Sequence, residues 1–399
     1  MQTSSKAAII TFIIASLAYA TAVAVWALVD APGTWTYNLL NARPARGEMG
    51  LGRFTIRGTR YINGHSTPFA YAWRSAIPNP LGRWTAWAGY SVHQLGQWLI
   101  LAQFQKKQQQ TNRDIRWSTD TRWWNTSMVL LNSIMMVYKL VQTHVAYDGL
   151  AIDVSEGTAQ GSVIAVLVVA LILAIPRRGI LFGKGGRSAS TVSLFGQVLD
   201  FVKRYHGYVM SFGTVYNFHY HPAEGTLGHF GGFFYQCLLL WQSSSFMHQS
   251  HRNRLWILLL ETFVFFHGTL TALCQPGSAA WQIFSFGFAI LFFVNQLYDL
   301  VRPSFKVVAT GFSLLIAAAA YGFHDDPAYY RMTFIPLAQY TSMLLCLGLG
   351  IMTALVVNPW SSARWRRIVV AAMYVGTSAL LTVGMAVVLA GNLKVYNDY

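Results

Sequence analysis

The sequence has few charged residues, fewer acids and almost no cysteine. Only 11% of its 399 residues are charged, whereas a soluble domain carries about 25%. Lys and Arg number 29, against 14 acids. The three cysteines, Cys237, Cys274 and Cys346, lie in apolar runs without metal-ligand spacing. These absences exclude an ordinary soluble globular fold, a disulfide framework and a cysteine zinc site.

Several catalytic motifs are also missing. The chain has no phosphate-binding loop, nucleotide fingerprint or serine-nucleophile elbow. Membrane di-iron hydroxylases and desaturases use repeated HxxxH and HxxHH clusters, but no two histidines are adjacent here. One HxxH, at His248 and His251, and one HxH, at His219 and His221, are present. We therefore predict no metal and no cofactor. A mononuclear site built from His219, His221, Glu224, His229 or His267 remains the alternative, since imidazole suits iron, copper and zinc.

Apolar runs of about 20 residues, each ended by charge, Pro or Gly, recur along the chain. The expected fold class is all-α, a polytopic helical membrane protein with about ten or eleven transmembrane helices. The count depends on whether 84–104 spans the bilayer or is re-entrant. The expected helices cover 7–29, 84–104, 124–146, 160–175, 195–220, 226–247, 254–274, 279–300, 306–323, 334–357 and 366–390.

One integral membrane domain is expected over 1–399. Within it, 30–83 forms a long loop rich in Arg, Gly and aromatic residues. The segment 84–300 forms the catalytic helical core, and 301–399 supplies the C-terminal helices.

The loop charges predict an orientation. Lys and Arg gather in 105–122, 176–194, 248–254, 301–306 and 358–367, whereas the alternate loops hold only Arg331. By the positive-inside rule the basic loops face the cytoplasm, although the seven Arg of the first loop break the pattern. The net charge of +15 therefore indicates membrane topology and lipid contact rather than nucleic-acid binding. We expect a multi-pass protein of the endoplasmic reticulum membrane.

Ionisable side chains converge on the non-cytoplasmic half of this topology. Seven of the eleven histidines fall between His206 and His267. Ionisable groups inside a bilayer are costly and functional by default. The converging side chains come from the loop at 147–159 and the helix turn before it, from 219–229, from the helix 254–274 and from the loop at 324–326. They include His144, Asp148, His219, His221, Glu224, His229, Glu261 and His267.

Proton chemistry in an apolar cavity suits these residue types. Glu261 lies within LLLETFVFF, where a lone carboxyl must be protonated or paired. A protonated acid can donate, aromatic faces can stabilise a developing cation, and neutral histidine can recover the proton. The predicted catalytic residues are Glu261, Glu224, His221, His267 and Asp148. The predicted substrate-binding residues are His219, His229, Phe233, Phe265 and His144.

Structural roles stay open for several of these residues. Glu224 suits the first turn of a helix that begins at Pro222, and Glu261 suits a hydrogen bond between helices. His93 suits an interhelical hydrogen bond. His248 and His251 suit contact with headgroups beside Arg252 and Arg254. Gly231 and Gly232 suit close helix packing.

Six strings carry a resemblance to a known family: YDGLAID (147–153), QGSV (160–163), PRRG (176–179), YHGY (205–208), HPAEGTLGH (221–229) and ETFVFFHG (261–268). Over roughly residues 84–300 the chain resembles fungal transmembrane terpene cyclases of the ascochlorin and ascofuranone type. The resemblance implies cyclisation of an epoxide-terminated farnesyl chain carried by an aromatic meroterpenoid precursor. It assigns no catalytic residue.

Three functions follow. The first is a membrane terpene cyclase, of isomerase or lyase type, whose partners are a lipophilic isoprenoid substrate and membrane lipids, with no nucleic acid. The second is a metal-dependent membrane oxidoreductase or hydroxylase that uses the His and Glu cluster. The third is a transporter-like, non-catalytic membrane protein. No pair of broken half-helices with internal symmetry is visible, which weighs against transport.

Overall fold

A computed structural model of the chain describes most of its helical core. Every regular element in the described part is a helix, and extended backbone pairs only at the isolated bridges Ser118–His248 and Leu181–Lys184. The all-helical prediction is confirmed for this part of the chain. The described residues are 10, 12–19, 21, 80–111, 117–146, 149–154, 156–184, 189–222, 227–274, 280–296, 304, 307, 308, 310, 311, 314, 315, 332–357, 364, 365, 368, 369, 371, 372 and 376.

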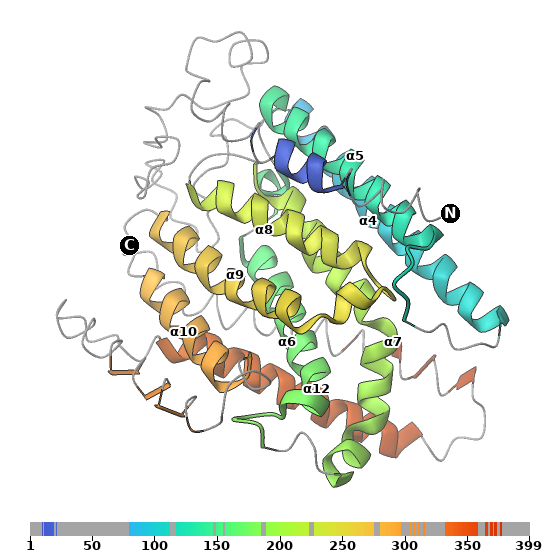
Figure 1. Cartoon of the computed structure of the whole chain (residues 1–399), viewed down its shortest axis with the longest axis vertical. Helices are drawn as coiled ribbons and strands as arrows, with labels where there is room; N and C mark the ends of the chain where they lie inside the picture. The colour runs from blue at the N-terminus through green and yellow to red at the C-terminus, as the bar shows by residue number, and fades with distance from the viewer. Residues whose placement is uncertain are drawn as a thin grey trace. The chain divides into compact units, whose positions relative to one another are not determined.

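The described helices coincide with apolar runs of the sequence, and Figure 1 shows them as ribbons. The helix α4 (Pro80–Thr111) extends beyond its apolar run. It continues to Thr111 through a stretch of Gln and Lys, which are good helix formers. The predicted loop at 30–83 lies outside the described residues, apart from its last four. The elements are α4 (Pro80–Thr111), α5 (Trp123–Ala146), η1 (Leu150–Ile152), α6 (Glu156–Arg178), α7 (Ala189–Tyr220), α8 (Leu227–Ser244), η2 (Gln249–Arg252), α9 (Arg254–Cys274), α10 (Ala280–Val294) and α12 (Phe334–Val357).

Local sequence sets two of the helix ends that matter below. Asn253 caps α9, because its Oδ1 accepts the backbone N–H groups of Leu255 and Trp256 at 3.0 and 3.1 Å. Gly179 directly follows the last residue of α6, Arg178, and terminates the helix. Its φ of 76° is a left-handed conformation that glycine adopts without strain.

Two compact units make up the chain. Unit 1 comprises Met1–Ala159, Met210–Trp281 and Tyr396–Tyr399, and unit 2 comprises Gln160–Val209 and Gln282–Val395. In unit 1, α4 packs along α5 and α8 packs along α9, while α5 also contacts α8 (Figure 1). The core of unit 2 joins residues of α6, α7 and α12, such as Ile172, Leu199 and Leu347. This division leaves the prediction of a single membrane domain untested.

Two described helices are long and apolar enough to cross a membrane: Thr158–Arg178, with 21 residues, and Phe334–Thr353, with 20. Length and composition alone support this coarser form of the membrane prediction.

The helices α4 and α5 have a polar buried side and an apolar exposed side. On α5, Asn132, Lys139 and Thr143 are fully buried, while apolar neighbours are half exposed or more. On α4, His93 and Gln97 are fully buried in the same way. The exposed apolar residues are Val92, Leu95, Leu99, Leu130, Ile134, Val137 and Val141, which are 50–60% exposed. This arrangement reverses the usual pattern of a helix at a water-facing surface.

Candidate functional site

The C-terminal end of α7 is buried within unit 1. His219 and Tyr220 are buried there, and Tyr220 donates its hydroxyl to the Val154 carbonyl at 3.0 Å. The backbone of Gly149 lies so close to this end that an added Cβ would be 2.3 Å from the Tyr220 carbonyl oxygen. The segment YDGLAID therefore needs its glycine to pack against the histidine-bearing end of α7.

His219 belongs to a buried hydrogen-bond chain. Its Nε2 lies 3.1 Å from His93 Nδ1, and His93 Nε2 lies 2.9 Å from Asn132 Oδ1. The Gln97 amide donates to the same Asn132 oxygen at 2.8 Å. Asn132 in turn donates to the Leu240 carbonyl at 3.0 Å. The chain joins α4, α5, α7 and α8, and the prediction that His93 makes an interhelical hydrogen bond is confirmed.

Lys139 places a cation beside two histidines. It is fully buried, and its Nζ donates to Gln142 Oε1 at 3.1 Å. Its charge acts on both His219 and His221. A buried ammonium group costs free energy unless it is hydrogen-bonded, so lysine at this position needs polar partners inside the protein.

Three histidines gather where α7, α8 and α9 meet. The rings of His221 and His229 are 5.8 Å apart, and the charge of His267 acts on both. Burial lowers the pKa of His221 well below its ordinary value, and the charges of His229, His267 and Lys139 lower it further. The group therefore favours neutral imidazole at His221, which can accept a proton.

Close approach of α9 to α8 positions His267. A Cβ at Gly232 would lie 2.6 Å from His267 Cε1, so only glycine leaves room for the ring. The Thr271 hydroxyl lies 3.2 Å from His267 Nδ1. The packing role predicted for Gly232 thus serves a site histidine.

Aromatic rings pack between α8 and α9, the helix that carries Glu261. Glu261 lies near enough to the Tyr235 phenol to influence it electrostatically. Tyr235 stacks on Phe263 with ring centres 5.8 Å apart, and it lies 5.8 Å from the His267 ring. Phe234, which lies on α8 like Tyr235, also contacts Phe263 of α9, with ring centres 5.6 Å apart. A carboxyl, a phenol and an imidazole therefore share an aromatic environment between α8 and α9.

The predicted site residues divide into three sets. Glu261, His221, His229 and His267 lie around the α8–α9 contact, whereas His219 belongs to the hydrogen-bond chain of His93 and Asn132. Phe233 packs into the core with Phe218, their ring centres 6.0 Å apart, and Phe265 meets Phe266 edge-on at 5.3 Å. Glu224 and Asp148 lie outside the described residues, as does the side chain of His144, whose backbone is helical in α5.

The other histidines of the central stretch tie turns together. His248 Nε2 donates to the Thr119 carbonyl at 2.8 Å, and His251 Nδ1 donates to the Gln242 carbonyl at 2.9 Å. Trp117 stacks on the His251 ring at 5.8 Å. The HxxH pair thus holds η2 against the segment that precedes α5.

No group of three or more His, Cys, Asp or Glu within the described ranges is arranged to hold a metal ion. That statement does not extend to Glu224 or Asp148. In the buried hydrogen-bond chain, both ring nitrogens of His93, the Asn132 carboxamide and His219 Nε2 have hydrogen-bond partners within the protein.

Sequence reasoning missed Asn132 and Lys139. The signal was present in the predicted helix 124–146, since Asn132, Lys139 and Thr143 recur at intervals of seven and four residues. That spacing places three polar groups on one face of an otherwise apolar helix. Such a face must be buried against protein when the rest of the helix is apolar.

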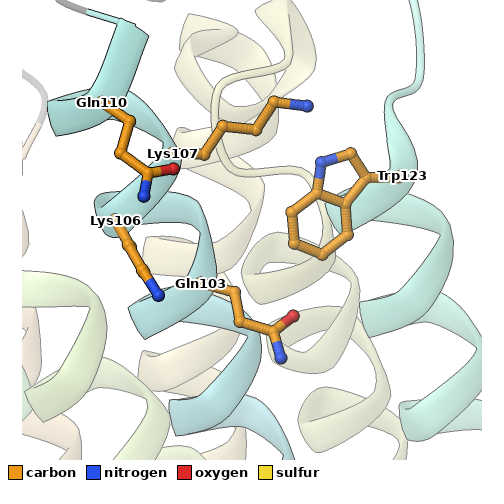
Figure 2. A pocket seen from close by; sticks show the side chains of 5 residues that line it. All are labelled: Gln103, Lys106, Lys107, Gln110 and Trp123. Atoms are coloured by element: carbon orange, nitrogen blue, oxygen red, sulfur yellow. The ribbon is translucent and has the colours of Figure 1, made fainter.

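A basic hollow of about 400 Å³ lies further along α4, where Lys106, Lys107 and Trp123 surround it together with Gln103 and Gln110 (Figure 2). Gln103 follows His93 by ten residues, which is about 15 Å of helix. The hollow is therefore separate from the histidine site. Its cations and indole suit contact with lipid headgroups.

Comparisons of the chain with models of protein families, with curated proteins and with solved structures found no match.

Proposed function

We propose that the protein is a multi-pass membrane terpene cyclase of the endoplasmic reticulum. It cyclises an epoxide-terminated farnesyl chain attached to an aromatic meroterpenoid precursor. The observation that carries this proposal is the contact between α8 and α9. There Glu261 lies on α9, which packs along α8, and Tyr235 of α8 lies 5.8 Å from the His267 ring among the rings of Phe234 and Phe263.

The exterior of α4 and α5 supports membrane embedding beyond the two apolar spans. Leu130, Ile134 and Val137 are 55–60% exposed, while Asn132 and Lys139 on the same helix are fully buried. In water this pattern would leave apolar surface solvated and polar groups desolvated. In a bilayer the outward face meets acyl chains and the polar groups pair inside the protein. A lipophilic substrate would enter the site from the same phase.

The proposed reaction begins at Glu261. Its protonated carboxyl gives a proton to the epoxide oxygen, the C–O bond breaks, and a carbocation forms next to the aromatic faces. Alkene electron pairs of the farnesyl chain then close the rings. Loss of a proton from carbon leaves the final double bond, so the product is an isomer of the substrate. Glu224, His221 and His267 orient the substrate or accept this last proton.

Product mass tests the proposal against its alternatives. Microsomes containing the protein are incubated with an epoxyfarnesyl phenol, beside microsomes that lack it. A cyclase yields a product of unchanged mass in which the epoxide is replaced by a hydroxyl group and at least one new carbocycle. A product heavier by one oxygen would support the oxidoreductase hypothesis, and recovery of unchanged substrate alone would contradict both enzymatic hypotheses.

A further inference from the structure

The buried chain of Asn132, His93 and His219 has a single direction for its hydrogen bonds. Heavy-atom distances alone do not show which ring nitrogen of a histidine carries the proton. In a chain of hydrogen bonds, however, a group that can only accept at one end sets the donor and acceptor of every following bond. That fixed end is the carbonyl of Leu240 on α8.

Asn132 can hold its amide in only one orientation. Its Nδ2 lies 3.0 Å from the Leu240 carbonyl oxygen and 2.8 Å from Ser244 Oγ. Ser244 donates its own proton to the Leu240 carbonyl at 2.8 Å, so its oxygen accepts from Asn132. A flipped amide would set its oxygen against that carbonyl. Asn132 Oδ1 therefore points toward α4 as an acceptor.

This acceptor fixes the proton of His93. His93 Nε2 lies 2.9 Å from Asn132 Oδ1 and must donate to it. The Gln97 amide fills the second lone pair of that oxygen at 2.8 Å. In neutral His93, Nδ1 is then unprotonated, so it accepts from His219 Nε2 at 3.1 Å.

We infer that His219 is held with its proton on Nε2 and its Nδ1 bare, as the proton acceptor of unit 1. No donor in the described part of the chain hydrogen-bonds to this Nδ1. His219 is 1% exposed, and the charge of Lys139 acts on it. A neutral base is thus fixed in orientation and tautomer inside the protein.

The acceptor role rests on the proposed cyclisation, which must release one proton. In that step a C–H bond next to the final carbocation breaks and its electron pair becomes the double bond. The proton goes to His219 Nδ1, and Glu224, His221 and His267 then keep the orienting role. The resulting imidazolium keeps its Nε2–H hydrogen-bonded to His93. The added charge is therefore shared along the hydrogen bonds that join His219, His93 and Asn132.

Nitrogen NMR of ¹⁵N-histidine-labelled protein in detergent tests the tautomer without any substrate. The expected spectrum shows His219 and His93 each protonated on Nε2 and bare on Nδ1. Asn132→Leu removes the acceptor and should release His93 from this tautomer. Gln94→Leu is the matched control, because the Gln94 amide donates to Ser211 Oγ at 3.1 Å and takes no part in the hydrogen-bond chain of Asn132, His93 and His219. A proton on Nδ1 of His219 in the parent protein would overturn the inference, even if a variant does not fold.

Turnover of the epoxyfarnesyl phenol tests the acceptor role. His219→Gln keeps an N–H donor for His93 but has no base at the Nδ1 position, so turnover should fall about 10²–10⁴-fold. The His93 tautomer should stay unchanged in the same variant. Normal turnover in His219→Gln, with turnover lost in Glu261→Gln, would overturn the acceptor role alone. Normal turnover in both would reject the proposed acid chemistry, while the NMR result would still decide the tautomer.

Discussion

At the scale of single residues, unit 1 concentrates ionisable groups where water is scarce. Lys139 is fully buried, and its charge acts on His219 and His221. A cation near His221 disfavours a second positive charge there, so His221 should stay neutral until a reaction delivers a proton.

His221 should make stability depend on pH. Its folded-state pKa is lowered by burial and then by His229, His267 and Lys139. The unfolded chain, with an ordinary pKa of about 6.5, takes up the proton first as the pH falls. The stability contributed by neutral His221 is thus complete above about pH 6.5 and is lost progressively below it.

Thermal unfolding in detergent at about pH 7 and about pH 5 checks this expectation. The parent protein should unfold at a lower temperature at the acidic pH. His221→Gln removes the titrating group and should reduce the difference. Lys139→Met removes one cause of the lowered pKa and should reduce it less. An undiminished pH dependence in His221→Gln would contradict the assignment.

At the scale of elements, the approach of α9 to α8 organises the acid and the imidazole. Gly232 lies against the His267 ring, with a Cβ position 2.6 Å from Cε1, whereas neighbouring Gly231 meets only Leu270 Cδ2, at 3.3 Å. Both glycines lie inside α8, so replacement by alanine adds similar helix propensity to each.

Alanine at these two positions should therefore have opposite effects. Gly232→Ala must displace the His267 ring and should lower stability by about 1–3 kcal/mol, the usual cost of overpacking. Gly231→Ala should be neutral or slightly stabilising, since Leu270 can shift. Chemical unfolding of the two purified variants measures the difference. Equal stability of the two would show that His267 does not need the space at Gly232.

The elements themselves were largely readable from sequence, whereas the partners of polar groups were not. The lengths of two apolar runs predict α8 and α9. The polar turn between these helices reverses the chain direction, so that Glu261 of α9 returns toward the histidines of α8. The chain of His93, Asn132 and His219 instead depends on side-chain contacts between four helices. A single sequence records the spacing of Asn132 and Lys139 but not which helix covers that face.

At the scale of the whole molecule, the account requires a membrane around the helices. The exposed apolar faces of α4 and α5 and the alternation of basic loops lead to the same arrangement. We expect cysteines introduced at Ser155 and at Ser361, in a background without native cysteine, to react from opposite sides of sealed microsomes. A membrane-impermeant maleimide reports this, with detergent-opened vesicles as the control. Labelling of both from one side would contradict the topology.

Turnover by Glu261→Gln tests the central claim most directly. The amide keeps the shape and hydrogen-bonding capacity of the side chain but removes the acid. Thr262→Val is the matched control, because the Thr262 hydroxyl bonds only the Leu258 carbonyl of its own helix, at 2.7 Å. At equal protein abundance, cyclisation of the epoxyfarnesyl phenol should fall about 10²–10⁴-fold in Glu261→Gln and stay near normal in Thr262→Val. Near-normal cyclisation by Glu261→Gln would contradict the role of Glu261 as the initiating acid.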